Sequence, residues 1–225
     1  MKRFFRRHAT LWMLIGFCLL LGLFLSLRTG IFFTGRNLIN ILEANSFKLL
    51  LAIGMTFVIA SGGIDLSVGS ILSLSAIFTA LCMKQNIPVW LAILVGLLSG
   101  ILMGLINGAL IHFTGINAFI ITLGTSFLYR GLALIVTRGT PVSKLPAAYR
   151  AFGGGDIFQV ESGVYMALLV LLLSIPLLYK MRWGHYITTL GGNPVALRRC
   201  GVRTGAWRIS TFAVMGFLAA LAGII

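Results

Sequence analysis

Apolar runs follow one another along most of this sequence, and each is long enough, or nearly long enough, to cross a lipid bilayer. A membrane-spanning helix needs about 20 mostly apolar residues. Hydrophobic residues make up 59% of the chain and charged residues only 10%, whereas soluble domains carry about 25% charged residues. The pattern predicts an all-α, polytopic transmembrane helix bundle with about seven spans. It excludes soluble enzymes, disordered proteins, coiled coils and disulfide-stapled secreted domains.

The first two runs need separate comment. The first follows a cluster of basic residues, but no small-residue cleavage pattern comes after it, so we expect an uncleaved span rather than a signal peptide. The second is mixed, because residues 38–48 are amphipathic and the apolar part, 47–60, is short for a crossing. The expected runs are 11–27, 38–60, 71–83, 89–113, 118–136, 164–179 and 209–225.

The strongly basic composition fits a membrane protein better than a nucleic-acid-binding protein. The chain has 18 Lys and Arg against 4 acidic residues, and most of the basic residues flank apolar runs, as the positive-inside rule predicts. No basic stripe interleaved with aromatic residues occurs outside the runs, so we expect no nucleic-acid partner. The cysteines and histidines are scattered, with no metal-ligand spacing, so we expect no metal site.

The distribution of basic residues also predicts the orientation of the chain. With the N-terminus inside, ten basic residues fall on the inner side and seven on the outer side, and Arg130 is left within a span. The charges before the first span carry most of the weight. The inner residues are Lys2, Arg3, Arg6, Arg7, Lys180, Arg182, Arg198, Arg199, Arg203 and Arg208, and the outer residues are Arg28, Arg36, Lys48, Lys84, Arg138, Lys144 and Arg150.

Glycine recurs at every fourth position in the run 89–113. The glycines are Gly96, Gly100, Gly104 and Gly108. This spacing leaves one helix face almost without side chains, so that another helix backbone can approach closely. We interpret it as a helix–helix packing face, with a glycine-lined pore as the alternative.

A polar, glycine-rich stretch, SGGIDLSVGS at residues 61–70, interrupts the apolar pattern between two short runs. Gly62 and Gly63 permit irregular backbone, and Asp65 and Ser67 are good N-cap residues. Broken backbone at membrane depth survives only when it is buried in protein or lines a water-filled cavity. The residues leave two interpretations open: a plain cap between two helices, or a break that lines a transport path.

Arg130 lies far inside the run 118–136, in the stretch FIITLGTSFLYRGL. A charge at this depth must snorkel, pair or face water. We therefore keep two hypotheses, a structural role and a direct role in a path. Thr122 in the same stretch is grouped with Arg130 and with the break as a candidate path or structural residue.

The basic loop 180–208 contains start and stop signals for a short helix. Asn193 suits the N-cap and Pro194 the first helical position. Arg198 and Arg199 suit the last turn, and Gly201 suits the position after the helix. The residues between the signals are Val195, Ala196 and Leu197. Since an isolated helix of about two turns is unstable in water, we expect a partner surface: lipid headgroups, the rest of this protein or a cytoplasmic protein.

Motifs of common enzyme classes are missing. The sequence contains no HExxH, GxSxG, Walker lysine or dinucleotide fingerprint, so we expect no enzymatic activity. A proton- or sodium-coupled carrier usually shows more intramembrane ionisable groups than Asp65 and Arg130. If the chain is a transporter, its energy is expected to come from another subunit.

Three stretches together resemble the permease subunits of bacterial ABC importers for ribose and similar sugars. They are SGGIDLSVGS, FIITLGTSFLYRGL, and WGHYITTLGGNPVALRRCGVRT followed by GFLAALAGI. The resemblance runs from about residue 37 to residue 225, in the family's order and spacing. It implies that the loop 193–202 contacts a cytoplasmic ATP-binding subunit. It departs at Val195, where the family often has an acidic residue.

The resemblance also implies the setting of the chain. The implied partners are the ATP-binding subunit, a periplasmic solute-binding protein, a second permease copy or homologue, and the lipid bilayer. ATP is used by the partner subunit, so this chain is expected to bind no cofactor. We expect one permease domain over 1–225 in the bacterial inner membrane, with an N-terminal segment and first span at 1–36 and a coupling loop at 180–208. Because family members continue further, the chain looks like the N-terminal part of such a permease.

Two other functions are compatible with the residues. One is a secondary carrier or channel that works alone, and the other is a non-transporting scaffold or truncated remnant. Neighbouring genes for an ATP-binding subunit and a binding protein would favour the importer. The identity of the sugar does not follow from the sequence.

The orientation can be tested with cysteines placed at residues 150 and 198. In intact cells an impermeant thiol reagent is expected to label only the cysteine at 150, because the basic count places residues 141–162 outside and the loop 180–208 inside. Labelling only at residue 198 would show that the orientation of the chain is the reverse of the predicted one.

Overall fold

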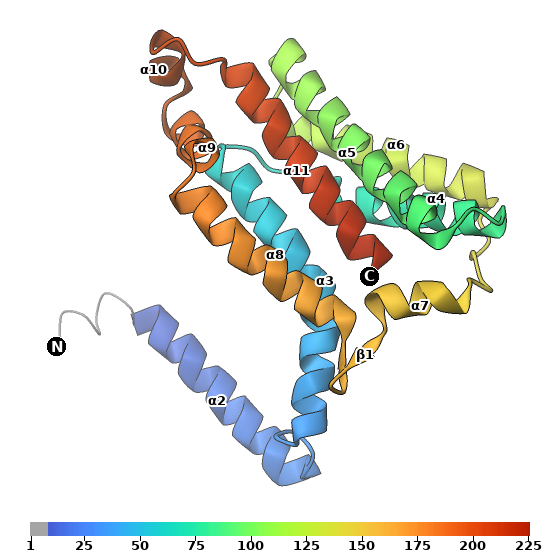
Figure 1. Ribbon diagram of the computed structural model, residues 1–225. Helices are drawn as coiled ribbons and strands as arrows, with labels where there is room; N and C mark the ends of the chain where they lie inside the picture. Colours follow the sequence, from blue (N-terminus) through green and yellow to red (C-terminus); the bar gives the residue numbers. More distant parts are fainter. Residues whose placement is uncertain (1–8) are drawn as a thin grey trace. The chain divides into compact units, whose positions relative to one another are not determined.

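The computed structural model describes residues 9–225 and shows an almost entirely helical chain (Figure 1). Six helices are long and apolar enough to cross a membrane, and a shorter apolar helix, Val68–Lys84, accompanies them. This confirms the predicted polytopic helical bundle. The long helices are α2 (Ala9–Thr29), α3 (Gly35–Ala60), α5 (Val89–Thr114), α6 (Ala118–Thr137), α8 (Ser162–Tyr179) and α11 (Thr204–Ile224). The shorter helices are α4 (Val68–Lys84), α7 (Ala147–Gly153), α9 (Arg182–Gly192) and α10 (Pro194–Arg199).

The chain forms two compact units, residues 1–44 and 45–225. The described part of the first unit contains α2 and the beginning of α3, and Asn37 Nδ2 donates a hydrogen bond to the Phe32 carbonyl oxygen, 2.8 Å away, in the turn between them. The sequence predicted a mixed second segment with a short apolar part. The structure has one continuous helix of 26 residues instead, since no proline or glycine pair separates the amphipathic half from the apolar half.

Helix α11 occupies the centre of the second unit, between α5 and α4 on one side and α3, α8 and α9 on the other (Figure 1). It is the most deeply buried of the long apolar helices. Phe212 and Met215 of α11 pack with Val58, Ile71 and Leu74 in one apolar cluster. Two further clusters join α11 to α3 and α8, and to α3 and α9. The core therefore surrounds the last helix of the printed sequence.

The four regularly spaced glycines of α5 lie against other helices. A Cβ at Gly104 would overlap the Phe212 carbonyl oxygen of α11, and one at Gly108 would lie 2.7 Å from the Ile209 Cα. Gly100 faces Gly216 of α11, and a Cβ on either would meet the carbonyl oxygen of the other. At the other end of the row, a Cβ at Gly96 would overlap Thr79 Oγ1 of α4 and lie 2.9 Å from Ile224 Cδ1 of α11.

Two segments between spanning helices contain regular structure that the sequence did not predict. Residues 137–163 include α7 and a short antiparallel hairpin, β1 (Asp156–Ile157) and β2 (Val160–Glu161). The Tyr149 hydroxyl of α7 donates a hydrogen bond to the Ile224 carbonyl oxygen, 2.8 Å away. The basic loop contains α9 in addition to the short helix that the capping signals predicted.

The packing of α5 on α11 can be tested with Gly100→Leu and Gly104→Leu. Each side chain would overlap facing backbone, and overpacking of a tight contact typically costs about 1–3 kcal/mol or more. We expect less folded protein in the membrane and a lower Tm of the purified protein in detergent. Gly124→Leu is the matched control, because a Cβ at Gly124 of α6 meets nothing within 4 Å. Unchanged stability in both α5 variants would contradict the packing described above.

Candidate functional site

The glycine-rich break between α3 and α4 is built as a helix stop followed by an irregular segment, in which Asp65 and Ser67 are buried while Ile64 and Leu66 are exposed. The Gly63 amide donates to the Val58 carbonyl oxygen at 3.0 Å and the Gly62 amide to Ile59 at 2.9 Å. These are the two hydrogen bonds of a Schellman motif, and Gly62 occupies its left-handed position with φ +80°. The break therefore begins with a regular helix end that requires glycine.

The backbone of the break finds its hydrogen-bond partners on α6. The Leu66 amide donates to Thr122 Oγ1 at 3.1 Å, and the same hydroxyl lies 3.2 Å from the Ile64 carbonyl oxygen and 2.8 Å from that of Ala118. Thr122 is fully buried. Backbone groups at membrane depth have no water to bind. The Thr122 hydroxyl therefore replaces the hydrogen-bond partners that the Leu66 amide and the Ile64 carbonyl would have in a continuous helix.

A chain of buried polar side chains connects the break to α5 and α6. Asp65 Oδ1 accepts hydrogen bonds from the Ser67 amide at 2.8 Å and from Ser67 Oγ at 2.6 Å. Asn107 Nδ2 donates to Ser67 Oγ at 2.7 Å, and the Tyr129 hydroxyl lies 3.2 Å from Asn107 Oδ1. Asp65, Ser67 and Asn107 have no exposed surface. Asp65 Oδ2 is buried without a hydrogen-bond partner.

This geometry bears on both interpretations of the break, as a cap between two helices and as the lining of a transport path. Ser67 stands at the N-cap of α4, but its side chain makes no capping hydrogen bond and turns to Asp65 instead. The carboxylate of Asp65 is enclosed by protein rather than open to a cavity. The break thus has a buried polar side, formed by Asp65 and Ser67, and its hydrogen bonds to Asn107 and Thr122 hold the start of α4 against α5 and α6.

A polar groove lies beside the break, between α4 and α6. It has a volume of about 310 Å³, and its lining includes Ser70, Ser73, Ser126 and Arg130. The hydroxyls of Ser70 and Ser126 are 2.9 Å apart. Arg130 is exposed and lies about 18 Å along the helix axis from the start of α6 at Ala118. The groove therefore presents hydroxyls and one cation at the depth of a membrane span.

The short helix α10 has the two ends that its sequence signals indicate. Asn193 Oδ1 accepts a hydrogen bond from the Ala196 amide at 2.9 Å, and Pro194 occupies the first turn. Gly201 follows the helix with φ +77°. Leu197 is 5% exposed and anchors the helix, whereas Val195 is 58% exposed. Arg198 and Arg199 are also exposed.

The end of α9 connects α10 to the break. A Cβ at Gly191 would overlap the Ala60 carbonyl oxygen at the end of α3, and a Cβ at Gly62 would lie 3.2 Å from the Gly191 Cα. Two residues after Gly191, the chain reaches the Asn193 cap of α10. The backbone of the break and the backbone that leads into α10 are therefore in direct contact.

The structure groups the residues that the sequence singled out into two clusters. Gly62, Gly63, Asp65, Ser67 and Thr122 form the break, with Arg130 in the adjoining groove, and residues 193–201 form the α10 loop. Sequence reasoning missed Asn107, Tyr129, Ser73 and Ser126. A signal existed for Ser126, since Thr122, Ser126 and Arg130 recur at four-residue spacing on one helix face.

Among the described residues, no group of three or more His, Cys, Asp or Glu is arranged to hold a metal ion.

Substitution of Asp65 tests whether its hydrogen bonds stabilise the break. Asp65→Asn keeps the oxygen that accepts both bonds from Ser67, whereas Asp65→Ala removes it. Loss of a buried partner costs about 1–3 kcal/mol, so the Tm in detergent is expected to fall clearly in the alanine variant and little in the asparagine variant. Equal losses in the two variants would contradict this role.

Comparison with known proteins places these features in a family. The family described as the permease component of the branched-chain amino acid transport system matches residues 37–225. The ribose import permease protein of Haemophilus influenzae is 36% identical over 198 residues, covering 86% of this chain and 61% of its own length. That of Escherichia coli K12 is 35% identical over 198 residues, covering 86% and 62%. The D-allose transport system permease protein of Escherichia coli K12 is 33% identical over 223 residues, covering 99% and 68%.

The chain thus spans about three fifths of the length of the ribose permeases that it matches. No solved structure matches it. The family match covers the break, the groove, the glycine contacts and the α10 loop together. With six helices of spanning length, the chain is a multi-pass membrane protein that belongs to this family of transport permease components.

Proposed function

We propose that this protein is a permease subunit of an ATP-driven importer for a sugar or a sugar-like solute. In this proposal it lies in the bacterial inner membrane with its N-terminus in the cytoplasm. Its partners are a cytoplasmic ATP-binding subunit, a periplasmic solute-binding protein and a second permease copy or homologue. ATP is bound by the partner subunit, and this chain needs no cofactor of its own.

The observation that carries the proposal is the geometry of α10. It is a helix of six residues, far shorter than a helix that is stable alone in water, yet it is capped by Asn193 and anchored by Leu197. The side chains of Val195, Arg198 and Arg199 remain exposed. A short, anchored and exposed helix between two spanning segments is suited to transmit the movement of another protein, and the family resemblance supports the ATP-binding subunit as that protein.

The contact between Gly191 and Gly62 supplies a route from α10 to the membrane interior. Because these backbones touch without intervening side chains, a displacement of α10 and the end of α9 moves the end of α3 and the break. The break in turn holds α4 against α6 through Thr122. In the proposed mechanism, closure of the ATP-binding subunit shifts α4 relative to α6 and so reshapes the groove between them.

The groove supports the proposed path. Ser70, Ser73 and Ser126 offer hydroxyls, and Arg130 offers five N–H donors, a set suited to the hydroxyl groups of a sugar. An arginine that faced lipid at this depth would cost about 2.5–3.5 kcal/mol or more. A second permease subunit that covers the α4–α6 face would replace lipid with protein and enclose the polar groove as a path.

The scarcity of ionisable groups supports an external source of energy. The chain contains only 4 acidic residues, and Asp65 is buried, with its Oδ1 atom hydrogen-bonded to Ser67. An ion-coupled carrier usually has more intramembrane ionisable groups. The relatives include permeases named for ribose, D-allose and fructose, and these names support a sugar as the solute.

Charge reversal on α10 tests the coupling role. In Arg198→Glu/Arg199→Glu, two acidic groups replace basic ones at the negative end of the helix dipole, which destabilises the helix and its contact. We expect normal membrane insertion but at least tenfold less co-purified ATP-binding subunit, roughly 1.4 kcal/mol or more. Val195→Asp, which keeps both arginines and places an acidic group in the first turn of α10, is not expected to weaken the contact. Lys84→Glu/Lys144→Glu is the control with the same change of charge.

The same variants separate the importer from the alternative of a carrier that works alone. Uptake of a labelled sugar, with ribose tested first, into proteoliposomes is expected only when the ATP-binding subunit, the solute-binding protein and ATP are all present. This uptake should fail in the α10 double variant. Uptake by this chain alone, or full stimulation of ATP hydrolysis by the double variant, would show that the proposal is wrong.

A further inference from the structure

A second cavity opens at the end of the bundle that carries α10. It has a volume of about 810 Å³ and lies between α10, the beginning of α11 and the end of α5. Its lining includes Arg198, Arg203, Arg208 and His112, and no acidic residue lines it. All four acidic residues of the chain, Glu43, Asp65, Asp156 and Glu161, lie elsewhere. This chain therefore supplies no carboxylate to neutralise the arginines of the cavity.

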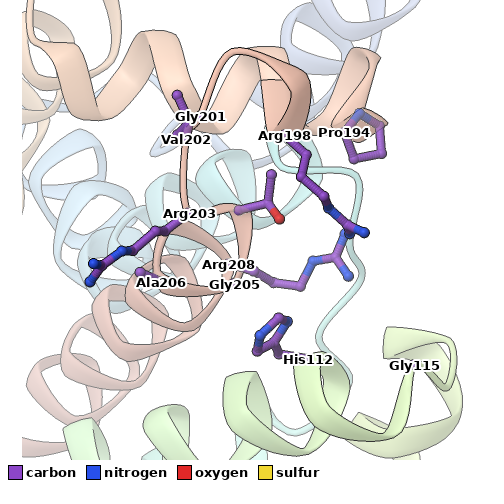
Figure 2. Close-up of a pocket in the computed structure, with 11 residues that line it drawn as sticks. His112, Gly115, Pro194, Arg198, Gly201, Val202, Arg203, Gly205, Ala206 and Arg208 are labelled. Carbon is purple, nitrogen blue, oxygen red and sulfur yellow. The ribbon is translucent and has the colours of Figure 1, made fainter. Parts of the chain in front are cut away.

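Two of the arginine side chains, those of Arg198 and Arg208, extend toward each other although they carry like charges (Figure 2). Figure 2 shows Arg198 of α10 and Arg208 of α11 extending toward the same part of the cavity, with the His112 ring on the facing wall and Arg203 directed away. The His112 ring is packed on the backbone of α11, where a Cβ at Gly205 would overlap it. Two guanidinium groups directed at one point are stabilised by an anion between them.

The beginning of α11 adds backbone donors to the same cavity. Thr204, Gly205 and Ala206 form its first turn and line the cavity, and Arg203 at the N-cap makes no side-chain capping hydrogen bond. The Ala206 amide donates to the Arg203 carbonyl oxygen at 3.1 Å, so the amide donors of this turn that can face the cavity are those of Thr204 and Gly205, at the positive end of the dipole of a 21-residue helix. Three kinds of donor, guanidinium, imidazole and amide, thus face one space from three elements.

We propose that this cavity binds a phosphate oxyanion, supplied by the headgroup of an acidic membrane lipid. Donors from three elements face one space from different sides, and a phosphate group presents its oxygens tetrahedrally, whereas the two oxygens of a carboxylate lie in one plane. His112 lies in the last turn of α5 and Thr204 in the first turn of α11, so the cavity lies where two spanning helices reach the headgroup region. Basic pockets between spanning helices at such a level bind anionic headgroups.

A bound headgroup would link α10 to the membrane. Arg198 belongs to the short helix, whereas Arg208 and His112 belong to spanning helices, so one phosphate between them ties the short helix to the bundle. This site goes beyond the proposed function, because it concerns a ligand of the chain itself and needs no ATP-binding subunit.

Native mass spectrometry of the purified full chain tests the site. Phosphatidylglycerol is titrated into protein taken from phosphatidylcholine bilayers, with Arg198→Gln/Arg208→Gln as the variant. Arg182→Gln/Arg199→Gln is the matched control, since it removes the same charge from exposed positions outside the cavity lining. We expect the wild type and the control to bind one phosphatidylglycerol with equal affinity. The cavity variant should bind about 30-fold more weakly, the usual effect of two arginines near an anionic surface.

A second measurement identifies the source of the phosphate. Inorganic phosphate is titrated into the same proteins by calorimetry, and circular dichroism checks that all variants remain folded. Selective loss of phosphatidylglycerol binding in the cavity variant supports a lipid site, and selective loss of inorganic phosphate binding alone supports a site for free phosphate. If neither ligand distinguishes the cavity variant from the control, the proposal is wrong, and the arginines are left for carboxylates of a partner protein.

Discussion

The close approach of α5 and α11 is the contact on which the rest of the second unit depends. At Gly100 and Gly216 the two backbones leave no room for a methyl group on either side. In a bilayer, lipid tails are as apolar as leucine, so helices associate through tight packing and hydrogen bonds rather than through the hydrophobic effect. With α11 held in this way, Phe212 and Met215 can form a core with α3 and α4. Neighbouring clusters then attach α8 and α9 to the same helix. The packed pair α5–α11 thus provides the fixed frame against which the irregular elements are placed.

The break between α3 and α4 depends on neighbouring helices for the hydrogen-bond partners of its polar groups. Irregular backbone inside a membrane needs protein partners for its N–H and C=O groups, and Thr122 and Asp65 supply them for Leu66, Ile64 and Ser67. In a continuous helix, the same backbone N–H and C=O groups would bond to one another and would not need the side chains of Thr122 and Asp65. What the break adds is a start of α4 beside the Ser70–Ser126 groove and a glycine contact with Gly191 of α9. The break therefore joins the groove between α4 and α6 to the loop that carries α10.

In two regions of this chain, polar or charged groups are exposed without a neutralising or covering partner from the chain itself. The α4–α6 groove exposes Arg130 at membrane depth, and the cavity beside α10 gathers arginines without a lining carboxylate. Both arrangements are costly in isolation, since a cation is stabilised only by water, an anion or a hydrogen-bond acceptor. The proposed occupants differ in kind: a solute and a second permease subunit for the groove, and a phosphate for the cavity. In both regions, the physical requirement is a partner from outside the chain.

The features that depend on local chemistry could be predicted from the amino-acid sequence. Apolar run length predicted the spanning helices, Asn193 and Pro194 predicted the start of α10, and the glycine spacing predicted a bare face on α5. No local signal predicted α7, α9 or the hairpin. That the glycine face of α5 meets α11 could not be predicted either, because a helical period defines a face but not the helix that packs on it. The same holds for Asn107 with Ser67, 40 residues apart, and for Arg198 with Arg208 in one cavity. These pairings follow from which helices lie side by side, and that is fixed by packing over the whole bundle.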